Sequence, residues 1–162
     1  MVKHTIAVLV ENKAGVLSRI SGLFARRGFN IDSLAVGPTE DPLISRITII
    51  VDGDDYMAEQ VTKQLNKLID VLKVRNLAEN EITRRELALV KVNVDESKRG
   101  EIVDIAKIMG CEIVDISHTT LMIEFDDRPE RVDLLIDLLS KYSIAEMART
   151  GTIALQKGQE SV

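Results

Sequence analysis

The sequence predicts an α+β protein built from two successive units, each with the order strand–helix–strand–strand–helix–strand. Three observations support this fold class. Alternating strand patterns are interleaved with helical apolar faces, the same order occurs in both halves, and glycine or proline marks helix boundaries. With 162 residues, 45% of them hydrophobic, the chain is long enough for two small domains with aliphatic cores.

The first half contains six predicted elements. Gly28 follows the first helix and suits its C-terminal stop, and the run 52–55 opens the second helix with acidic residues. The predicted elements are strands Ile6–Val10, Ile31–Val36, Leu43–Val51 and Leu72–Asn76, helix Val16–Arg27, and a helix with its apolar face from Met57 to Ile69.

The second half repeats this order. One helix ends before Gly110, and another begins at Pro129, where the missing N–H of proline costs nothing. The predicted elements are strands Leu87–Val94, Ile113–Ile116 and Thr119–Phe125, a last strand between Ile144 and Leu155, and helices with apolar faces from Ile102 to Met109 and from Val132 to Leu139.

This order predicts two tandem ferredoxin-like βαββαβ domains, each with a four-stranded antiparallel sheet and two helices on one face. We expect domains at 3–77 and 85–157, a linker at 78–84 and a polar tail at 158–162. The other face of each sheet has no cover of its own, so we expect association through sheet faces or edges.

Composition excludes several functions. The net charge is −5, and residues 81–162 hold sixteen acidic and eleven basic side chains, so no basic surface for nucleic acid is expected. Aromatic residues are only 3%, which disfavours base stacking. No signal segment or bilayer-length apolar run is present, so we expect a cytoplasmic protein without a membrane partner.

Catalytic and metal-binding patterns are also missing from the sequence. His4 and His118 fall in no nucleophile–base pattern, and together with the single Cys111 they form no metal-ligand spacing. Cys111 precedes an apolar strand and is expected to be a buried, inert thiol. We therefore expect no catalytic residue, metal or cofactor in this chain.

The most informative segment is the junction between the first strand and the first helix, residues 12–20. A helix start leaves backbone N–H groups unpaired, and their partial positive charge suits a small carboxylate or phosphate. Gly15 leaves room for such an anion because it has no side chain. Asn12 lies in the same loop, where turn formation is its simplest role.

Asn30 and Ile31 follow the first helix. The amide of Asn30 has the donor and acceptor atoms that an amino acid needs, although a helix-terminal turn explains it equally well. Leu17, Ile31 and Val36 favour a small branched aliphatic ligand. Asn30 and Gly15 meet at one ligand only if two sheets pair across a subunit boundary.

These segments resemble the start of the regulatory small subunit of acetohydroxyacid synthase (AHAS), also called acetolactate synthase. The first unit is similar to an ACT domain, an amino-acid-sensing fold. The resemblance covers nearly the whole chain and rests on residues 10–20, 23–34, 39–42, 45–46, 85–89 and 148–151.

The resemblance implies a subunit without synthase activity of its own. It implies a large catalytic partner that uses thiamine diphosphate, Mg and FAD, joins two 2-oxo acids and releases carbon dioxide. It also implies activation of that partner, feedback inhibition by valine, leucine or isoleucine, and a homodimer formed through ACT domains. The effector would contact Asn12, Gly15, Val16 and Leu17 of one subunit, and Asn30 and Ile31 of the other.

Two other interpretations remain open from the sequence. Residues 15–19 also resemble the phosphate-binding loop of acylphosphatases, small hydrolases in which Arg19 would hold a phosphate and Asn30 would orient water. The second of these interpretations is an amino-acid-responsive transcription regulator, but no helix-turn-helix segment or basic surface in the sequence supports it.

Overall fold

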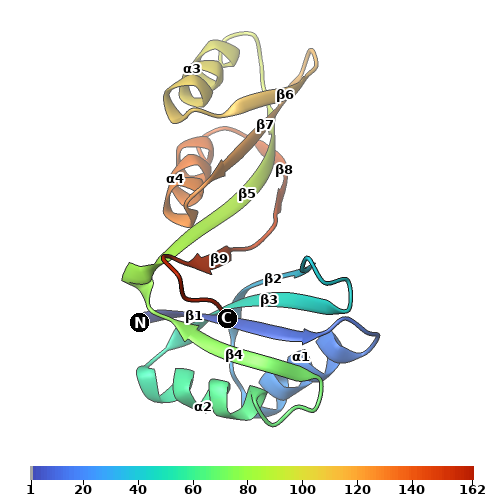
Figure 1. Ribbon diagram of the computed structural model, residues 1–162. Coiled ribbons are helices and arrows are strands. Elements are labelled where there is room, and N and C mark those ends of the chain that lie inside the picture. Colours follow the sequence, from blue (N-terminus) through green and yellow to red (C-terminus); the bar gives the residue numbers. More distant parts are fainter. Residues whose placement is uncertain (1) are drawn as a thin grey trace. The chain divides into compact units, whose positions relative to one another are not determined.

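The computed structural model describes residues 2–162, which form two compact units (Figure 1). The first unit extends to Arg84 and also includes Thr152–Val162, and the second unit spans Arg85–Gly151. Each unit has the strand and helix order that the sequence predicts. The α+β fold class with two ferredoxin-like units is therefore confirmed.

The first unit has an antiparallel sheet in the order β2-β3-β1-β4, with α1 and α2 on one face (Figure 1). Alternate residues of β1, namely Ile6, Val8 and Val10, are buried in the cluster beneath these helices. Its elements are β1 (Val2–Glu11), α1 (Val16–Arg27), β2 (Ile31–Pro38), β3 (Ile44–Gly53), α2 (Asp55–Leu65) and β4 (Val71–Leu77).

The two helices of this unit begin differently. Asp54 precedes α2, and its Oδ1 accepts a hydrogen bond from Met57 N at 2.8 Å, so the acidic run 52–55 has the capping role expected for it. Gly15 precedes α1 and provides no side-chain cap. Gly28 ends α1 with a left-handed φ of 67°, as predicted.

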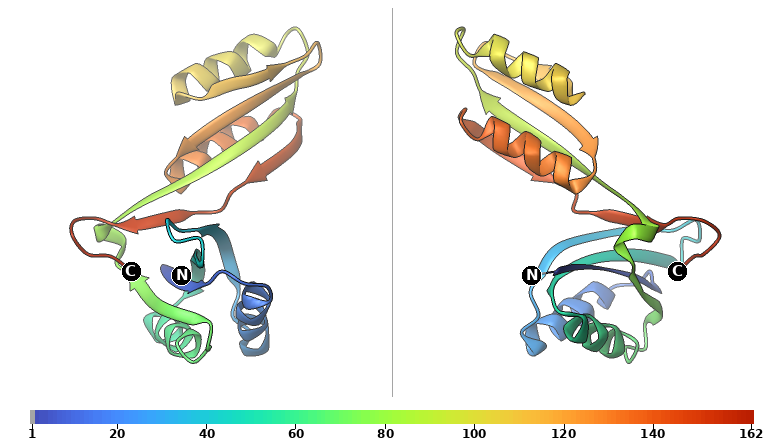
Figure 2. Two further views of the ribbon diagram at one scale, coloured as in Figure 1. Left: turned by 45° about the vertical axis from the view of Figure 1, so that its right-hand side comes forward. Right: turned by 90° about the vertical axis from the view of Figure 1, so that its left-hand side faces the viewer.

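The second unit has strand order β6-β7-β5-β8, and α3 and α4 lie together on one face of its sheet (Figure 2). Gly110 ends α3 with φ 78°, and Pro129 begins α4. Its elements, after a short 3₁₀ turn at Glu79–Glu81, are β5 (Ile82–Asn93), α3 (Arg99–Met109), β6 (Glu112–Ile116), β7 (Thr120–Asp127), α4 (Pro129–Leu139) and β8 (Ile144–Arg149).

The last strand differs from the single strand expected between Ile144 and Leu155. The structure has β8, which pairs with β5, and a separate β9 (Ile153–Gln156). Gly151 lies between them with φ 79°, a left-handed conformation that turns the chain out of the β8 direction. The sequence patterns of the two short strands are too similar to show this break.

Residues 152–162, here called the C-terminal segment, cover part of the first sheet on the face away from its helices (Figure 2). Thr152 N donates to Ser33 Oγ at 2.9 Å. The expected C-terminal domain extended to residue 157 with a polar tail at 158–162, whereas the contacts of this segment group it with the first unit. A small buried cluster attaches it: Ala7, Leu77, Ile82 and Ala154, with Val162 packed against them.

We predict that Ala154→Asp detaches the C-terminal segment. Ala154 is 3% exposed among Ala7, Leu77 and Ile82, and burying a carboxylate in this apolar cluster costs about 2 kcal/mol or more. Amide hydrogen exchange of residues 153–162 should accelerate strongly. Ile153→Asp is the matched control because Ile153 is 57% exposed in the same strand. Equal exchange in both variants would contradict the attachment.

Candidate functional site

The loop between β1 and α1 is fastened to the turn between β2 and β3. Asn12 N donates to Leu43 O at 2.7 Å, and Asn12 Nδ2 donates to Pro42 O at 2.8 Å. Asn12 therefore has the turn-forming role expected from the sequence. Its side-chain oxygen remains able to accept a further hydrogen bond.

Gly15 is the residue before α1, and its φ of 87° strongly favours glycine. The first turn of α1 contains no acidic residue and no side-chain cap. Among residues 2–162, no backbone acceptor pairs with the N–H groups of Leu17 and Ser18, and Val16 N lies 3.5 Å from Lys13 O. These N–H groups are thus open to a ligand.

Helix α2 has the side-chain cap that α1 lacks, because the carboxylate of Asp54 accepts from Met57 N at 2.8 Å. Ahead of α3, the carboxylate of Asp95 accepts from the N–H of Lys98, the residue before the helix, at 2.8 Å. The Asp95 pKa is lowered, mainly because Ser97 donates a hydrogen bond to the carboxylate. At α1 the corresponding position is occupied by no carboxylate of the described chain.

Asp70, just before β4, holds the loop in place. Its side chain is only 4% exposed and lies 2.9 Å from Lys13 Nζ and 2.6 Å from the Arg19 guanidinium. Asp70 O also accepts from Glu11 N at 2.9 Å, and Lys13 pairs with Glu11 as well. One residue therefore connects the end of β1, the loop and the first turn of α1.

These contacts shift the pKa values of the partners in opposite directions. The hydrogen bond from Lys13, followed by that from Arg19, lowers the pKa of Asp70 below its ordinary value of 3.8. Hydrogen bonds to Glu11 and then Asp70 raise the pKa of Lys13. The sequence analysis did not identify Asp70, because an acidic residue before a strand belongs to no periodic pattern that would indicate its partners.

We predict that Asp70→Asn lowers the urea midpoint of unfolding at pH 7, because Arg19 then has no carboxylate. Since folding lowers the Asp70 pKa, its stabilising contribution is present above pH 3.8 and is lost as the pH falls through the lowered value. The difference between the two proteins should therefore shrink in acid.

Asp104→Asn is the control for this comparison, because Asp104 is exposed and has no ion pair among residues 2–162. It should unfold like the parent protein at every pH. A constant difference between Asp70→Asn and the parent down to strong acid would contradict the ionic role of Asp70.

The predicted residues of the first turn contribute in different ways. The Val16 side chain is 3% exposed and belongs to the core, so only its backbone faces a ligand. Leu17 is 43% exposed and offers an aliphatic surface beside the open N–H groups. A carbon at the Cβ position of Gly15 would lie 3.4 Å from Arg19 Nη1, so a side chain there would contact the guanidinium.

Asn30 and Ile31 lie at the opposite end of α1. Asn30 is exposed, and Ile31 is half-buried at the start of β2. Because α1 has 12 residues, the two ends are separated by about 18 Å. One chain therefore does not bring Asn30 to Gly15.

The acylphosphatase-like interpretation requires a free arginine in the first turn. Arg19 instead donates from Nε to Asp70 Oδ2 at 2.6 Å and is held by that carboxylate. A phosphate would have to displace Asp70 to reach it, so the geometry disfavours phosphate binding.

The histidines and the cysteine form no reactive site among the described residues. His4 is buried with its Nε2 3.8 Å from Asp55 Oδ1, and His118 is exposed. Residues 2–162 contain no group of three metal-ligating side chains, nor a helix long and apolar enough to cross a bilayer. Burial raises the pKa of the Cys111 thiol to about 11.

We predict slow reaction of Cys111 with a thiol reagent such as a disulfide dye. At pH 7 a thiol with this pKa is ionised in about one molecule in ten thousand, and only the thiolate attacks. The same reagent should react fully and quickly with the chain in urea, and Cys111→Ser provides the blank. Rapid labelling of the folded protein would show an activated thiol.

Comparison with known proteins covers both units. Residues 6–73 match a family model described as AHAS small subunit-like ACT domain, and residues 85–158 match one described as small subunit of acetolactate synthase. The probable acetolactate synthase small subunit of Archaeoglobus fulgidus is 52% identical over 158 residues, which cover 98% of this chain and 99% of the relative.

Two further relatives agree. The acetolactate synthase small subunit of Mycolicibacterium smegmatis is 46% identical over 159 residues, covering 98% of this chain and 94% of the relative. The crystal structure of the acetolactate synthase small subunit from Thermotoga maritima superposes with a TM-score of 0.90 at 40% identity, and covers 99% of this chain and 100% of that one.

Two ferredoxin-like units, the first matching an ACT domain, define the class of ACT-domain proteins. More particularly, the chain belongs to the family of acetolactate synthase small subunits. It is a non-catalytic subunit of that enzyme and therefore has a large catalytic subunit as its partner. The family resemblance found in the sequence is confirmed.

Proposed function

We propose that this subunit activates the catalytic subunit of acetolactate synthase and makes it sensitive to feedback inhibition by valine, or by leucine or isoleucine. Thiamine diphosphate, Mg and FAD belong to the catalytic subunit in this proposal. The observation that carries it is the uncapped start of α1, where open N–H groups face a position without a side chain.

The chemistry of this helix start favours a carboxylate over a phosphate. Lys13 and Arg19 are already paired with Glu11 and Asp70, so the nearby cations carry little free charge. The attraction comes mainly from the helix N–H groups, which suit a singly charged group. Leu17 adds an aliphatic neighbour for a branched side chain.

The binding site is completed by a second copy of the chain. β1 and β2 are both antiparallel to β3, so they run in the same direction and end at the same side of the sheet. The loop before α1 therefore lies at the side where β2 ends, as the contacts of Asn12 with Pro42 and Leu43 also show.

β2 is an edge strand suited to pairing with its own copy. Its one charged residue, Asp32, pairs with Lys3 at 2.7 Å, whereas the other edge strand, β4, carries Lys73 and Arg75. Charged edges resist pairing, and β2 has the less protected edge. Two-fold antiparallel pairing of β2 strands brings the start of one β2, with Asn30 and Ile31, to the end of the other.

Regulation follows if the effector binds one arrangement of the two subunits better than another. A ligand that touches Gly15 of one subunit and Asn30 of the other senses their relative placement directly. A coupling free energy of about 1–3 kcal/mol is typical and changes activity several-fold or more.

We predict that two site variants, each impaired in valine binding when alone, complement each other in a mixed dimer. Gly15→Asp should abolish valine binding because its carboxylate competes for the helix start, and Asn30→Ala should weaken it. A dimer with one copy of each variant has one intact site and one doubly altered site. Calorimetry on differently tagged, co-purified dimers should therefore recover valine binding at half the sites.

Gly110→Asp controls for backbone strain, because Gly110 has a similar φ of 78° in the second unit and no atom within 4 Å of an added Cβ. It should bind valine normally, and all variants should still co-purify with the catalytic subunit. No recovery in the mixed dimer would show that Gly15 and Asn30 do not share a site across the interface.

A further inference from the structure

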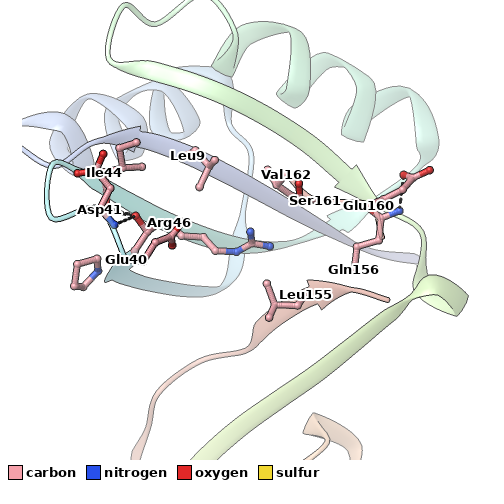
Figure 3. A pocket seen from close by; sticks show the side chains of 12 residues that line it. Leu9, Glu40, Asp41, Ile44, Arg46, Leu155, Gln156, Glu160, Ser161 and Val162 are labelled. Carbon is pink, nitrogen blue, oxygen red and sulfur yellow. Dashed lines mark hydrogen bonds between the residues drawn. The ribbon is translucent and has the colours of Figure 1, made fainter. Parts of the chain in front are cut away.

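The C-terminal segment forms a pocket with the first sheet, on the face away from α1 and α2 (Figure 3). Its volume is about 410 Å³, within the range of small-molecule sites. The sheet and the β2–β3 turn contribute Leu9, Pro38, Thr39, Glu40, Asp41, Ile44 and Arg46, and the C-terminal segment contributes Leu155, Gln156, Glu160, Ser161 and Val162.

Arg46 is the one basic side chain that lines this pocket. Among residues 2–162 its guanidinium has a single hydrogen-bond partner, the carbonyl oxygen of Ala154 at 2.8 Å, and no carboxylate. Figure 3 shows the side chain extending along the pocket toward its centre. Burial lowers the pKa of Arg46, and no acidic neighbour opposes this effect.

The other cationic side chains on this sheet face have hydrogen-bond partners in the C-terminal segment. Arg75 pairs with Glu160 and Gln156, each at 3.0 Å, and Lys73 donates to Ser161 O at 3.2 Å. Their partners come from the C-terminal segment. A half-buried guanidinium with spare donors and no anion is costly, so Arg46 is available for a carboxylate ligand.

The remaining lining supplies an acidic group and apolar surface. The Glu40 side chain, on the β2–β3 turn, has no hydrogen bond or ion pair among the described residues. Asp41 and Glu160 are already engaged, with Leu43 N and Arg75 respectively. Leu9 and Leu155 contribute aliphatic side chains near the middle of the pocket (Figure 3).

We propose that this pocket binds a second small ligand, an α-amino acid with an aliphatic side chain. Its carboxylate pairs with Arg46, its ammonium group pairs with Glu40, and its side chain contacts Leu9 and Leu155. A simple monocarboxylate fits less well, because the acidic rim repels it without compensation. This site is separate from the start of α1, which lies on the other side of the sheet.

The test uses calorimetry on the full chain with L-leucine as the probe. Gly15→Asp removes the site proposed at α1, so binding that persists in this variant belongs elsewhere. In the Gly15→Asp background, Arg46→Gln should weaken leucine binding about tenfold or more, and Arg46→Lys should restore part of the loss. Glu40→Gln should weaken it about threefold.

Two controls separate binding from folding. Glu40 bonds to nothing in the described chain, so Glu40→Gln should leave amide exchange of residues 153–162 unchanged. Glu112 is an exposed acidic residue of the second unit with no partner among the described residues, so Glu112→Gln should bind leucine as the unchanged protein does. The analogues 4-methylpentanoate and 3-methylbutylamine each lack one charged group and should bind at least about tenfold more weakly than leucine.

The outcomes distinguish the two sites. If Gly15→Asp binds no leucine at millimolar concentration, the pocket proposal is overturned and the α1 site stands. If Gly15→Asp binds as the parent does and Arg46→Gln abolishes binding, the pocket stands and the α1 site fails. Equal affinity for leucine and 4-methylpentanoate would contradict recognition of the ammonium group. Unchanged leucine binding in Arg46→Gln would overturn the proposal that the pocket is the binding site.

Discussion

The ion pairs of Asp70 with Lys13 and Arg19 position the chain between β1 and α1. Because these pairs are made by side chains, they fix the loop without using the N–H groups of the helix start. The backbone of Asp70 reinforces them by accepting from Glu11 N. The first turn of α1 is therefore held rigidly while its donors stay open, whereas α2 has a donor of its first turn satisfied by Asp54. A preorganised set of donors binds an anion without a cost of ordering.

The proposed effector site depends on dimer assembly for a geometric reason. Open N–H groups at one end of α1 lie about 18 Å from Asn30 at its other end, so a small ligand cannot contact both within one chain. In the proposed dimer, two-fold pairing of β2 strands brings these ends together from different copies. Effector binding energy is then realised only in the paired arrangement, and the ligand shifts the population toward it.

The elements were predictable where local signals are strong. Gly28, Gly110 and Pro129 mark helix boundaries through backbone constraints of a single residue, and the apolar periodicity of β1 and α1 identifies the buried faces. The site was predictable only in part. Gly15 indicates an open helix start from the sequence alone. The partners of Asp70 could not be predicted in this way, because they lie more than fifty residues away in sequence.

The C-terminal segment was the least predictable part for the same reason. Its last residues are mostly polar and its strand β9 has only four residues, so periodicity does not indicate where the segment packs. Its attachment depends on contacts far apart in the chain, such as those of Arg75 with Glu160 and of Ala154 with Ala7. Long-range pairing of this kind follows from the folded arrangement, which a single-sequence pattern does not encode.

This attachment also bears on the dimer that we propose. The sequence left face-to-face and edge-to-edge association equally open. The C-terminal segment covers Ala7 and Leu77 on the sheet face, and its polar groups neutralise Arg75, so that face is less available to a second copy. The edge of β2 keeps unpaired backbone groups and little charge, since Asp32 is already paired with Lys3. Covering the face from within the chain therefore favours the edge-to-edge pairing that we propose, in which Asn30 of one copy lies beside Gly15 of the other.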